Sequence, residues 1–227
     1  MKRRAGLALL TVSAALLLAG ALSAAADKAE KAAKADADGF VPLFDGKTLD
    51  GWKIGKNADS FEVVDGTICA HGPGPAHLFY DGPVANHDFK NFHLKAEVMT
   101  FPNSNAGIYF HTKYQEEGWP SQGFEAQVNN TYEKDPRKTA SLYMVKDVKE
   151  APAKDNEWFL YEIIVEGKTI TFKINGKTAN EFTEPADYKP PEKMPGRKLS
   201  HGTIALQGHD PGSKVCFRNI MVKPLPD

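Results

Sequence analysis

After its first 26 residues the sequence lacks any apolar run long enough to cross a bilayer. It also lacks an excess of either charge, because 28 Lys and Arg residues stand against 29 Asp and Glu residues. There is no basic patch of the kind that nucleic acids require, and no amphipathic basic helix that would bind a membrane surface. These absences exclude a nucleic-acid-binding protein and a membrane span beyond residue 26.

The N-terminal segment is typical of a secretory signal peptide. Residues 1–4 are basic, an apolar run rich in Leu and Ala follows, and small residues at 23–26 end it. We therefore expect residues 1–26 to be a cleaved signal peptide, the alternative being a membrane anchor. Residues 27–38 are charged and rich in alanine, which predicts a flexible linker before a domain at residues 39–227. The protein is then expected to be periplasmic or secreted.

Cysteine is scarce, with only Cys69 and Cys216 in the chain. Both lie in segments with strand character, T-I-C-A-H and K-V-C-F-R. In an exported protein they can form one disulfide. The alternative is a pair of buried thiols that behave as small apolar side chains.

Nearly all of the chain after Phe40 is predicted to form short strands, and no segment there shows a long helical period. Asp65-Gly66 and Asn175-Gly176 lie between such strands and are typical of tight hairpin turns. Many short strands in a domain of this size predict an all-β fold, a β-sandwich of two antiparallel sheets. The expected strands are residues 61–64, 67–71, 93–99, 107–112, 124–129, 141–145, 159–166, 169–174, 203–207 and 214–222.

The most informative strand lies within residues 123–130, G-F-E-A-Q-V-N-N. Successive side chains of a strand point to opposite faces, so this segment has an apolar face and a polar face. The apolar face is suited to the core and consists of Phe124, Ala126 and Val128. The polar face consists of Glu125, Gln127 and Asn129. A carboxylate followed by two amides indicates a surface that holds a polar ligand, since such residues have poor strand preference.

Other strands repeat this alternation, as in G-I-Y-F-H at residues 107–111 and I-A-L-Q-G-H at 204–209. If these strands share one sheet, its outer face carries Tyr109, His111, Glu125, Gln127, Asn129, Tyr143, Gln207 and His209. Aromatic rings with carboxylate, amide and imidazole groups suit the binding of a sugar. The alternative is an ordinary solvated face. Trp119 lies in the loop before the strand at residues 124–129. It is expected either to form a wall of the ligand-binding cleft or to anchor the loop on the core.

Several motifs, taken in order, resemble one known family. They are F-V-P-L-F-D-G-K-T-L-D-G-W, E-V-V-D-G-T-I, N-S-N-A-G-I-Y-F, G-F-E-A-Q-V-N-N, I-N-G-K, I-A-L-Q-G-H-D and F-R-N-I-M-V-K-P-L. Their order from Phe40 to Leu225 resembles the 3-keto-disaccharide hydrolase domain family. The resemblance implies a concanavalin A-like jelly-roll sandwich with its site on the concave face. It also implies an exported bacterial protein acting on 3-keto-glycosides. The chain departs from the common family pattern at His111, where many members have arginine, and at Phe159, where many have asparagine.

The central strand lacks the paired carboxylates of ordinary glycoside hydrolysis. Retaining glucanases on a related sandwich use one carboxylate as nucleophile and a second as general acid. Here the strand supplies Glu125 alone, because Gln127 and Asn129 carry amides that cannot act as nucleophile or acid. Ordinary retaining hydrolysis is therefore disfavoured, unless a second acid such as Asp210 comes from a loop.

Cleavage of a keto-sugar does not require paired carboxylates, because the ketone acidifies the hydrogen on the adjacent second carbon. One base removes that proton, the aglycone leaves by elimination, and water adds to the enone. The candidate catalytic residues are His209, Glu125 and His111. The candidate substrate-binding residues are Tyr109, Trp119, Gln127, Asn129, Lys138, Tyr143, Gln207 and Asp210. A divalent metal ion held by His111, Glu125, His209 and Asp210 is the alternative to part of this machinery.

The sequence therefore predicts a carbohydrate-active protein that cleaves 3-keto-glycosides by elimination and hydration. The first alternative is a non-catalytic, lectin-like carbohydrate-binding module on the same fold. The second alternative is a structural protein of the periplasm.

Overall fold

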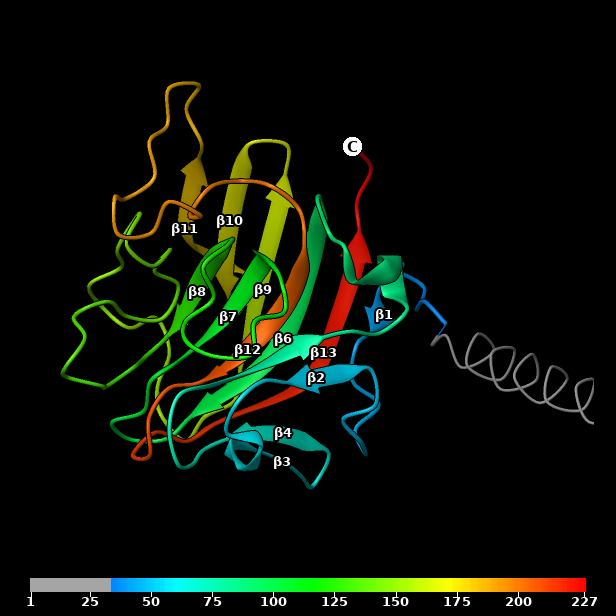
Figure 1. The fold of residues 1–227 in the computed structure, drawn as a ribbon, viewed down its shortest axis with the longest axis vertical. Coiled ribbons are helices and arrows are strands. Elements are labelled where there is room, and N and C mark those ends of the chain that lie inside the picture. The colour runs from blue at the N-terminus through cyan, green and yellow to red at the C-terminus, as the bar shows by residue number, and fades with distance from the viewer. Residues whose placement is uncertain (1–33) are drawn as a thin grey trace, which may run out of the picture. The chain divides into compact units, whose positions relative to one another are not determined.

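The computed structural model describes residues 34–227. The predicted signal peptide and residues 27–33 of the predicted linker lie outside the described residues. Residues 34–227 form one unit built from two antiparallel sheets (Figure 1). The predicted β-sandwich of two antiparallel sheets is confirmed.

The larger sheet has eight strands, in the order β11-β10-β9-β6-β13-β4-β3, with β1 paired to β13. Its strands are β1 (Val41–Pro42), β3 (Phe61–Val64), β4 (Thr67–Ala70), β6 (Phe92–Thr100), β9 (Phe159–Glu166), β10 (Thr169–Ile174), β11 (Lys177–Thr183) and β13 (Val215–Pro224). Asn175 and Gly176 both have positive φ, 51° and 77°, as the predicted tight turn between β10 and β11 requires.

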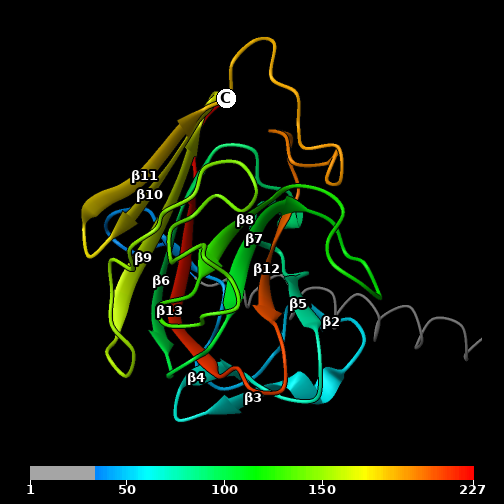
Figure 2. The ribbon, with the colours of Figure 1, turned by 90° about the vertical axis from the view of Figure 1, so that its left-hand side faces the viewer.

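The smaller sheet has five strands, in the order β2-β5-β12-β7-β8. Its strands are β2 (Trp52–Ile54), β5 (Ala76–Tyr80), β7 (Ala106–Thr112), β8 (Phe124–Val128) and β12 (Thr203–Gly208). Figure 2 shows the two sheets side by side, with long loops near β7 and β8. Two short 3₁₀ helices, η1 (Ala58–Ser60) and η2 (Val84–His87), complete the described elements.

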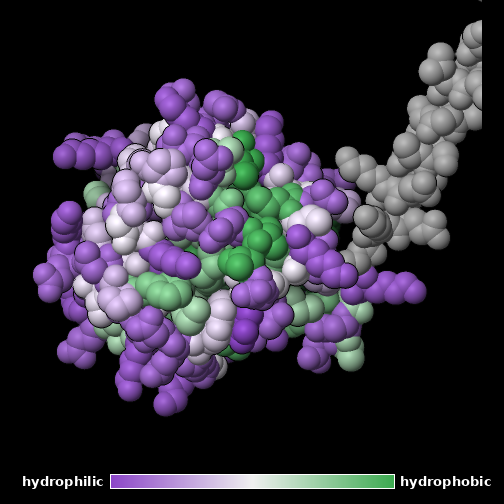
Figure 3. All heavy atoms as spheres, turned by 90° about the horizontal axis from the view of Figure 1, so that it is seen from below, coloured by the Kyte–Doolittle hydropathy of each residue, from purple (hydrophilic) through white to green (hydrophobic). Residues whose placement is uncertain are grey.

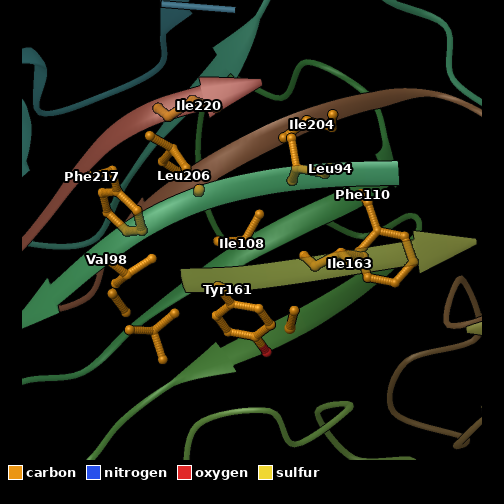
Figure 4. Packing of buried hydrophobic residues seen from close by; sticks show 14 of the residues in the cluster. Leu94, Val98, Ile108, Phe110, Tyr161, Ile163, Ile204, Leu206, Phe217 and Ile220 are labelled. Carbon is orange, nitrogen blue, oxygen red and sulfur yellow. The ribbon is translucent and has the colours of Figure 1, made fainter. Parts of the chain in front are cut away.

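The core fills the space between the two sheets. Figure 4 shows apolar side chains from β6, β9 and β13 of the larger sheet meeting those from β7 and β12 of the smaller one. The apolar face predicted for β8 lies in this core, where Phe124, Ala126 and Val128 are fully buried. The opposite face of the smaller sheet is therefore left free to carry polar groups.

Outside the core the domain is polar. Figure 3 shows hydrophilic residues around a strip of hydrophobic ones on the face seen from below. Within residues 34–227, the large hydrophobic side chains classed as exposed are Val64, at 39%, and Trp119, at 43%. None of the helices in this part of the chain has the length and apolar character that a bilayer-spanning helix needs.

One predicted strand, residues 141–145, is wrong. Leu142 forms isolated bridges to Ala126 and Lys146, but the segment turns instead of extending. The cause is local, because Ala140 and Met144 have positive φ values of 71° and 64° that no extended strand accommodates.

Four strands were not expected from the sequence, namely β1, β2, β5 and β11. The segment of β5, A-H-L-F-Y, directly follows the turn-forming run H-G-P-G-P. The segment of β11, K-T-A-N-E-F-T, is rich in residues with weak strand preference and pairs at the edge of the larger sheet. Tertiary pairing outweighs local preference in β11.

Cys69 and Cys216 form a disulfide, which resolves the alternative that the sequence left open. The two residues are direct partners in the register of β4 and β13. Both are almost fully buried, at 2% and 3% exposure. The bridge closes a loop between residues 147 positions apart, so it restricts the unfolded chain strongly.

We expect Cys216→Ala to lower the free energy of unfolding by about 2–5 kcal/mol, as loss of a native disulfide does in small exported domains. Urea titrations of the oxidised wild type, the reduced wild type and the variant measure this. The variant is the control for the reductant, whose addition should not change its midpoint. Two reactive thiols in the denatured, unreduced wild type would contradict the bridge.

Candidate functional site

The site lies on the outer face of the smaller sheet. Every residue of β5, β7, β8 and β12 is buried, on the outer face as well as on the core face. A solvated outer face, the alternative weighed from the sequence, is therefore wrong for these strands. A pocket opens on this face and is lined by Asn105, Tyr109, Trp119, Glu125, Gln127, Asp135, Tyr143, Met194, Gln207 and His209.

Glu125 is the buried centre of this face, and its two carboxylate oxygens accept hydrogen bonds from three side chains. Tyr109 donates its hydroxyl to Oε2 at 2.6 Å, and Arg197 donates to the same oxygen at 3.1 Å. Gln207 donates its amide nitrogen to Oε1 at 3.1 Å and lies equally close to the Tyr109 hydroxyl. A carboxylate held in this way is fixed in orientation and satisfied.

Burial raises the pKa of Glu125 above its usual range, although the Arg197 charge and the bonds from Tyr109 and Gln207 act in the opposite direction. Burial and the Glu125 charge also raise the pKa of the Tyr109 hydroxyl well above its usual value. Tyr109 therefore remains a hydrogen-bond donor. The cluster behaves as one electrostatic unit in which the Arg197 charge balances the Glu125 charge.

Gly107 on β7 makes room for the Glu125 side chain. A Cβ atom at this position would lie 2.8 Å from Glu125 Oε1 and 2.9 Å from its Cγ. Residue 107 pairs with Gln127 on β8, and its neighbour Tyr109 pairs with Glu125. The missing side chain lets the carboxylate reach across the strand to its donors.

His209 follows β12 directly and lines the pocket. Its Nδ1 lies 2.8 Å from Asp210 Oδ2, which also accepts the Ser213 hydroxyl at 2.7 Å. Ser213 in turn accepts the backbone amide of Asn105 at 2.8 Å. Burial alone would raise the pKa of Asp210, but bonds from Ser213, His209 and the Gly212 amide lower it. An ionised Asp210 fixes the proton of His209 on Nδ1 and leaves Nε2 as the basic nitrogen.

Aromatic rings surround His209. The ring centroid of Trp119 lies 5.3 Å from that of His209. The ring centroid of Tyr132 lies 5.7 Å from that of His209, in an edge-to-face arrangement. Trp119 also contacts His77, at 5.6 Å. Trp119 therefore walls the pocket, the first of the two positions weighed from the sequence, and keeps one exposed face for a ligand.

His77, which was not expected from the sequence, lies on β5 directly opposite Gln207 of β12. His77 is 4% exposed, and its Nε2 has no hydrogen-bond partner within residues 34–227. Burial, with the charges of His209 and Arg197, lowers the pKa of His77 to about 3. The alternation of A-H-L-F-Y carries the signal for His77, once that segment is assigned to a strand.

Four further residues of the site were also missed: Asn105, Asp135, Met194 and Arg197. Arg197 is 2% exposed and lies two residues after the proline-rich segment at residues 185–195. It reaches the sheet through bonds to Glu125 and to the Gly123 carbonyl at 3.0 Å. No periodicity of the sequence predicts such a contact.

His111 does not line the pocket. It has a positive φ of 54°, and the pairing of β12 with β7 shifts register between Thr203 and Ala205. The alternation that would place His111 beside Tyr109 is therefore broken. Its ring packs on Phe92 instead, with centroids 5.9 Å apart.

The ring nitrogens of His111 are occupied by the backbone. Nε2 donates to the Lys90 carbonyl at 2.8 Å, and Nδ1 accepts the Ser200 amide at 3.2 Å. Burial lowers the pKa of His111 to about 4, although the bond to Lys90 acts in the opposite direction. His111 therefore holds two segments together as a neutral imidazole.

Asn129 and Lys138 also lie outside the pocket lining. Asn129 Nδ2 donates to the carbonyls of Tyr132, Asp135 and Arg137, at distances of 2.8–3.3 Å. Lys138 Nζ donates to the Tyr132 carbonyl at 3.1 Å. Both side chains brace the loop that brings Asp135 to the pocket.

The four side chains weighed as metal ligands do not gather around one point. His111 is bound to the backbone away from the pocket, and both Glu125 oxygens have side-chain donors. Among residues 34–227, no group of three or more His, Cys, Asp or Glu residues is close enough to hold a metal ion. The residues present do not fit the metal centre considered from the sequence.

Comparison with known proteins agrees with this fold. The chain is 28% identical to a 3-keto-disaccharide hydrolase of Bacteroides thetaiotaomicron, in an alignment that covers 84% of this chain and 80% of that protein. A crystal structure from Parabacteroides distasonis, provisionally described as a glycosyl hydrolase, has a TM-score of 0.70 at 24% identity, covering 84% of this chain and 95% of that one. The carbohydrate-binding module CBM66 of Bacillus subtilis shares the fold with a TM-score of 0.53 at 11% identity, covering 76% and 95%.

Together these features define a carbohydrate-active protein on a jelly-roll β-sandwich. The model of the 3-keto-alpha-glucoside-1,2-lyase-like domain matches residues 39–223. The chain belongs to this family, as the order of its motifs predicts.

We expect Gly107→Ala to lower the free energy of unfolding by about 1–3 kcal/mol, because the added methyl group displaces the Glu125 carboxylate. Thermal and urea denaturation measure the change. Gly208→Ala is the matched control, since a Cβ there meets its nearest neighbours at ordinary contact distances of 3.7–3.9 Å. Equal effects of the two substitutions would contradict the close fit at Gly107.

The depressed pKa of His111 predicts acid sensitivity. Between its ordinary value of 6.5 and about 4, this histidine takes up a proton in the unfolded chain but not in the folded protein. The free energy of unfolding therefore falls with decreasing pH in this window, by up to about 3 kcal/mol from this residue. We expect a shallower fall for His111→Gln, measured by urea titration from pH 7 to pH 4. A slope for His111→Gln equal to that of the wild type would contradict the assignment.

Proposed function

We propose that this protein is an exported bacterial enzyme that cleaves 3-keto-glycosides by elimination followed by hydration. The observation that carries the proposal is the His209–Asp210 pair, at 2.8 Å, which opens onto a pocket whose central carboxylate is already occupied. The site thus offers one well-oriented base with a free nitrogen. A keto-sugar with an acidified hydrogen is the substrate that such a base can attack.

The arrangement of the acids argues against ordinary hydrolysis. Glu125 is paired with Arg197, and the second carboxylate of the pocket, Asp135, is paired with Arg137 at 3.1 Å. Each carboxylate is thus held beside a guanidinium group. Such pairing suits the stabilisation of charge more than the paired roles of nucleophile and proton donor.

In the first step, His209 Nε2 removes the proton from the second carbon of the ring, next to the ketone. The electron pair forms a double bond between the first and second carbons, and the bond to the aglycone oxygen breaks. The aglycone leaves with a proton, and the product is an enone. Asp210 holds the Nδ1 proton of His209 and stabilises the imidazolium that forms.

In the second step, water adds to the first carbon of the enone and a proton returns to the second carbon. The two steps together amount to hydrolysis of the glycoside. Tyr109 donates its hydroxyl to Glu125, which leaves Tyr143 as the lining phenol suited to proton exchange with the aglycone oxygen. Burial and the charges of Glu125 and Asp135 raise the pKa of Tyr143, which keeps the proton on the phenol.

Export is supported by the disulfide between Cys69 and Cys216, since such bonds form and persist outside the reducing cytoplasm. The basic start and apolar run at the N-terminus agree with it. The proposed location is the bacterial periplasm or the medium.

A non-catalytic carbohydrate-binding module is the second candidate. The fold that this chain shares with CBM66 and the exposed face of Trp119 both favour it. A module of this kind would bind a sugar through the pocket and leave it intact.

We expect wild-type protein to release the aglycone from a 3-keto-glucoside but not from the unoxidised parent glucoside. His209→Ala should lower the rate of release by about 10²–10⁴-fold, as loss of a general base does. The variant should still bind the 3-keto-glucoside. Aglycone absorbance and calorimetric binding are measured on the same samples.

His201→Ala is the matched control for His209→Ala, because His201 is paired with Asp88 on an exposed surface outside the pocket. It should keep the wild-type rate. Binding of a sugar with no release from any 3-keto-glucoside would favour the module over the enzyme. Full activity of His209→Ala would remove His209 from the mechanism.

A further inference from the structure

Gln207 is 1% exposed and lines the pocket together with Glu125. Its amide nitrogen faces Glu125 Oε1 and the Tyr109 hydroxyl, each at 3.1 Å. Its amide oxygen has no hydrogen-bond partner within residues 34–227. A buried acceptor without a partner costs free energy, so a ligand atom that donates a hydrogen bond is favoured at this point.

The orientation of this amide is set by its neighbour. If the group were turned over, its oxygen would face the carboxylate oxygen of Glu125, and two acceptors would lie at hydrogen-bond distance without a proton between them. The Glu125 carboxylate is itself held by Tyr109 and Arg197 and cannot turn away. Gln207 therefore presents an acceptor to the pocket and cannot present a donor.

We propose that Gln207 determines specificity by accepting a hydrogen bond from one hydroxyl of the sugar ring, and that it rejects rings in which this hydroxyl is oxidised to a ketone. This inference rests on the proposed keto-sugar substrate and names how the site distinguishes one keto-sugar from another. A carbonyl oxygen placed against Gln207 would meet a fixed acceptor. The ketone of a productive substrate must lie elsewhere in the pocket.

Glu125 thereby acts as a positioning residue. Its carboxylate fixes which end of the Gln207 amide faces the ligand. Gln127 offers a similar, independent case, since its nitrogen donates to Asn105 at 2.9 Å and its oxygen has no partner in the described part of the chain.

The test is the binding of 3-keto-glucosides that lack one hydroxyl, or carry fluorine in its place, by calorimetry with the His209→Ala protein. Fluorine keeps the size and the electronegativity of the hydroxyl but cannot donate. At one ring position we expect deoxy and deoxyfluoro ligands to bind about 10- to 100-fold more weakly than the parent, since both leave the Gln207 oxygen unpaired. The 3-keto-glucoside oxidised a second time at that position should bind as weakly.

Gln207→Met in the same background should abolish this discrimination, so that parent and deoxy ligands bind alike. Gln127→Met is the matched control and should retain the discrimination at that position. The proposal is overturned if the deoxyfluoro ligand binds as tightly as the parent, if no position discriminates, or if both Met variants lose the same discrimination. Because binding is measured in an inactive protein, these results are separate from the question of turnover.

Discussion

A carboxylate buried at the centre of a sheet face must be paired, and the rest of the site is arranged around that requirement. Glu125 cannot stay charged there without donors, since the loss of hydration would otherwise dominate. Tyr109, Gln207 and Arg197 supply the donors from a neighbouring strand, the next strand and a distant loop. Gly107 leaves the space that the carboxylate needs.

This constraint also divides the chemical roles. A carboxylate that already accepts hydrogen bonds from two side chains and a guanidinium group is fixed in place, whereas within residues 34–227 only Nδ1 of the His209 ring is bound to another side chain. Asp210 binds His209 and is itself held by the Ser213 hydroxyl. The Trp119 ring packs against the His209 ring. The pocket thus combines polar side chains of fixed orientation with one candidate base, His209. This combination suits a substrate that is already activated by oxidation.

Much of this arrangement follows from the two-residue alternation of strands. The alternation places Tyr109, Glu125, Gln127 and Gln207 on one face, and all four line the pocket. It fails at His111, where a positive φ turns the side chain toward Phe92. Alternation has meaning only while the backbone stays extended.

Other parts of the site were beyond sequence patterns. Arg197 lies in an irregular loop, so only the folded structure shows that it reaches Glu125. His77 belongs to β5, which was not expected because a turn-forming Gly-Pro run directly precedes it. The strand β11 forms by pairing with β10, although its residues have weak strand preference. Asn129 was expected to bind ligand, yet its amide braces a loop, because side-chain type does not reveal whether a polar group faces inward to backbone or outward to ligand.

The most direct test of the account is to cleave a 3-keto-glucoside in heavy water, stop the reaction by reduction, and locate deuterium in the sugar by mass spectrometry and NMR. Elimination followed by hydration predicts one solvent deuterium at the second carbon of the product, and His209→Ala should form little of it. A released sugar that keeps its original hydrogen at that carbon would show direct hydrolysis and would contradict the account.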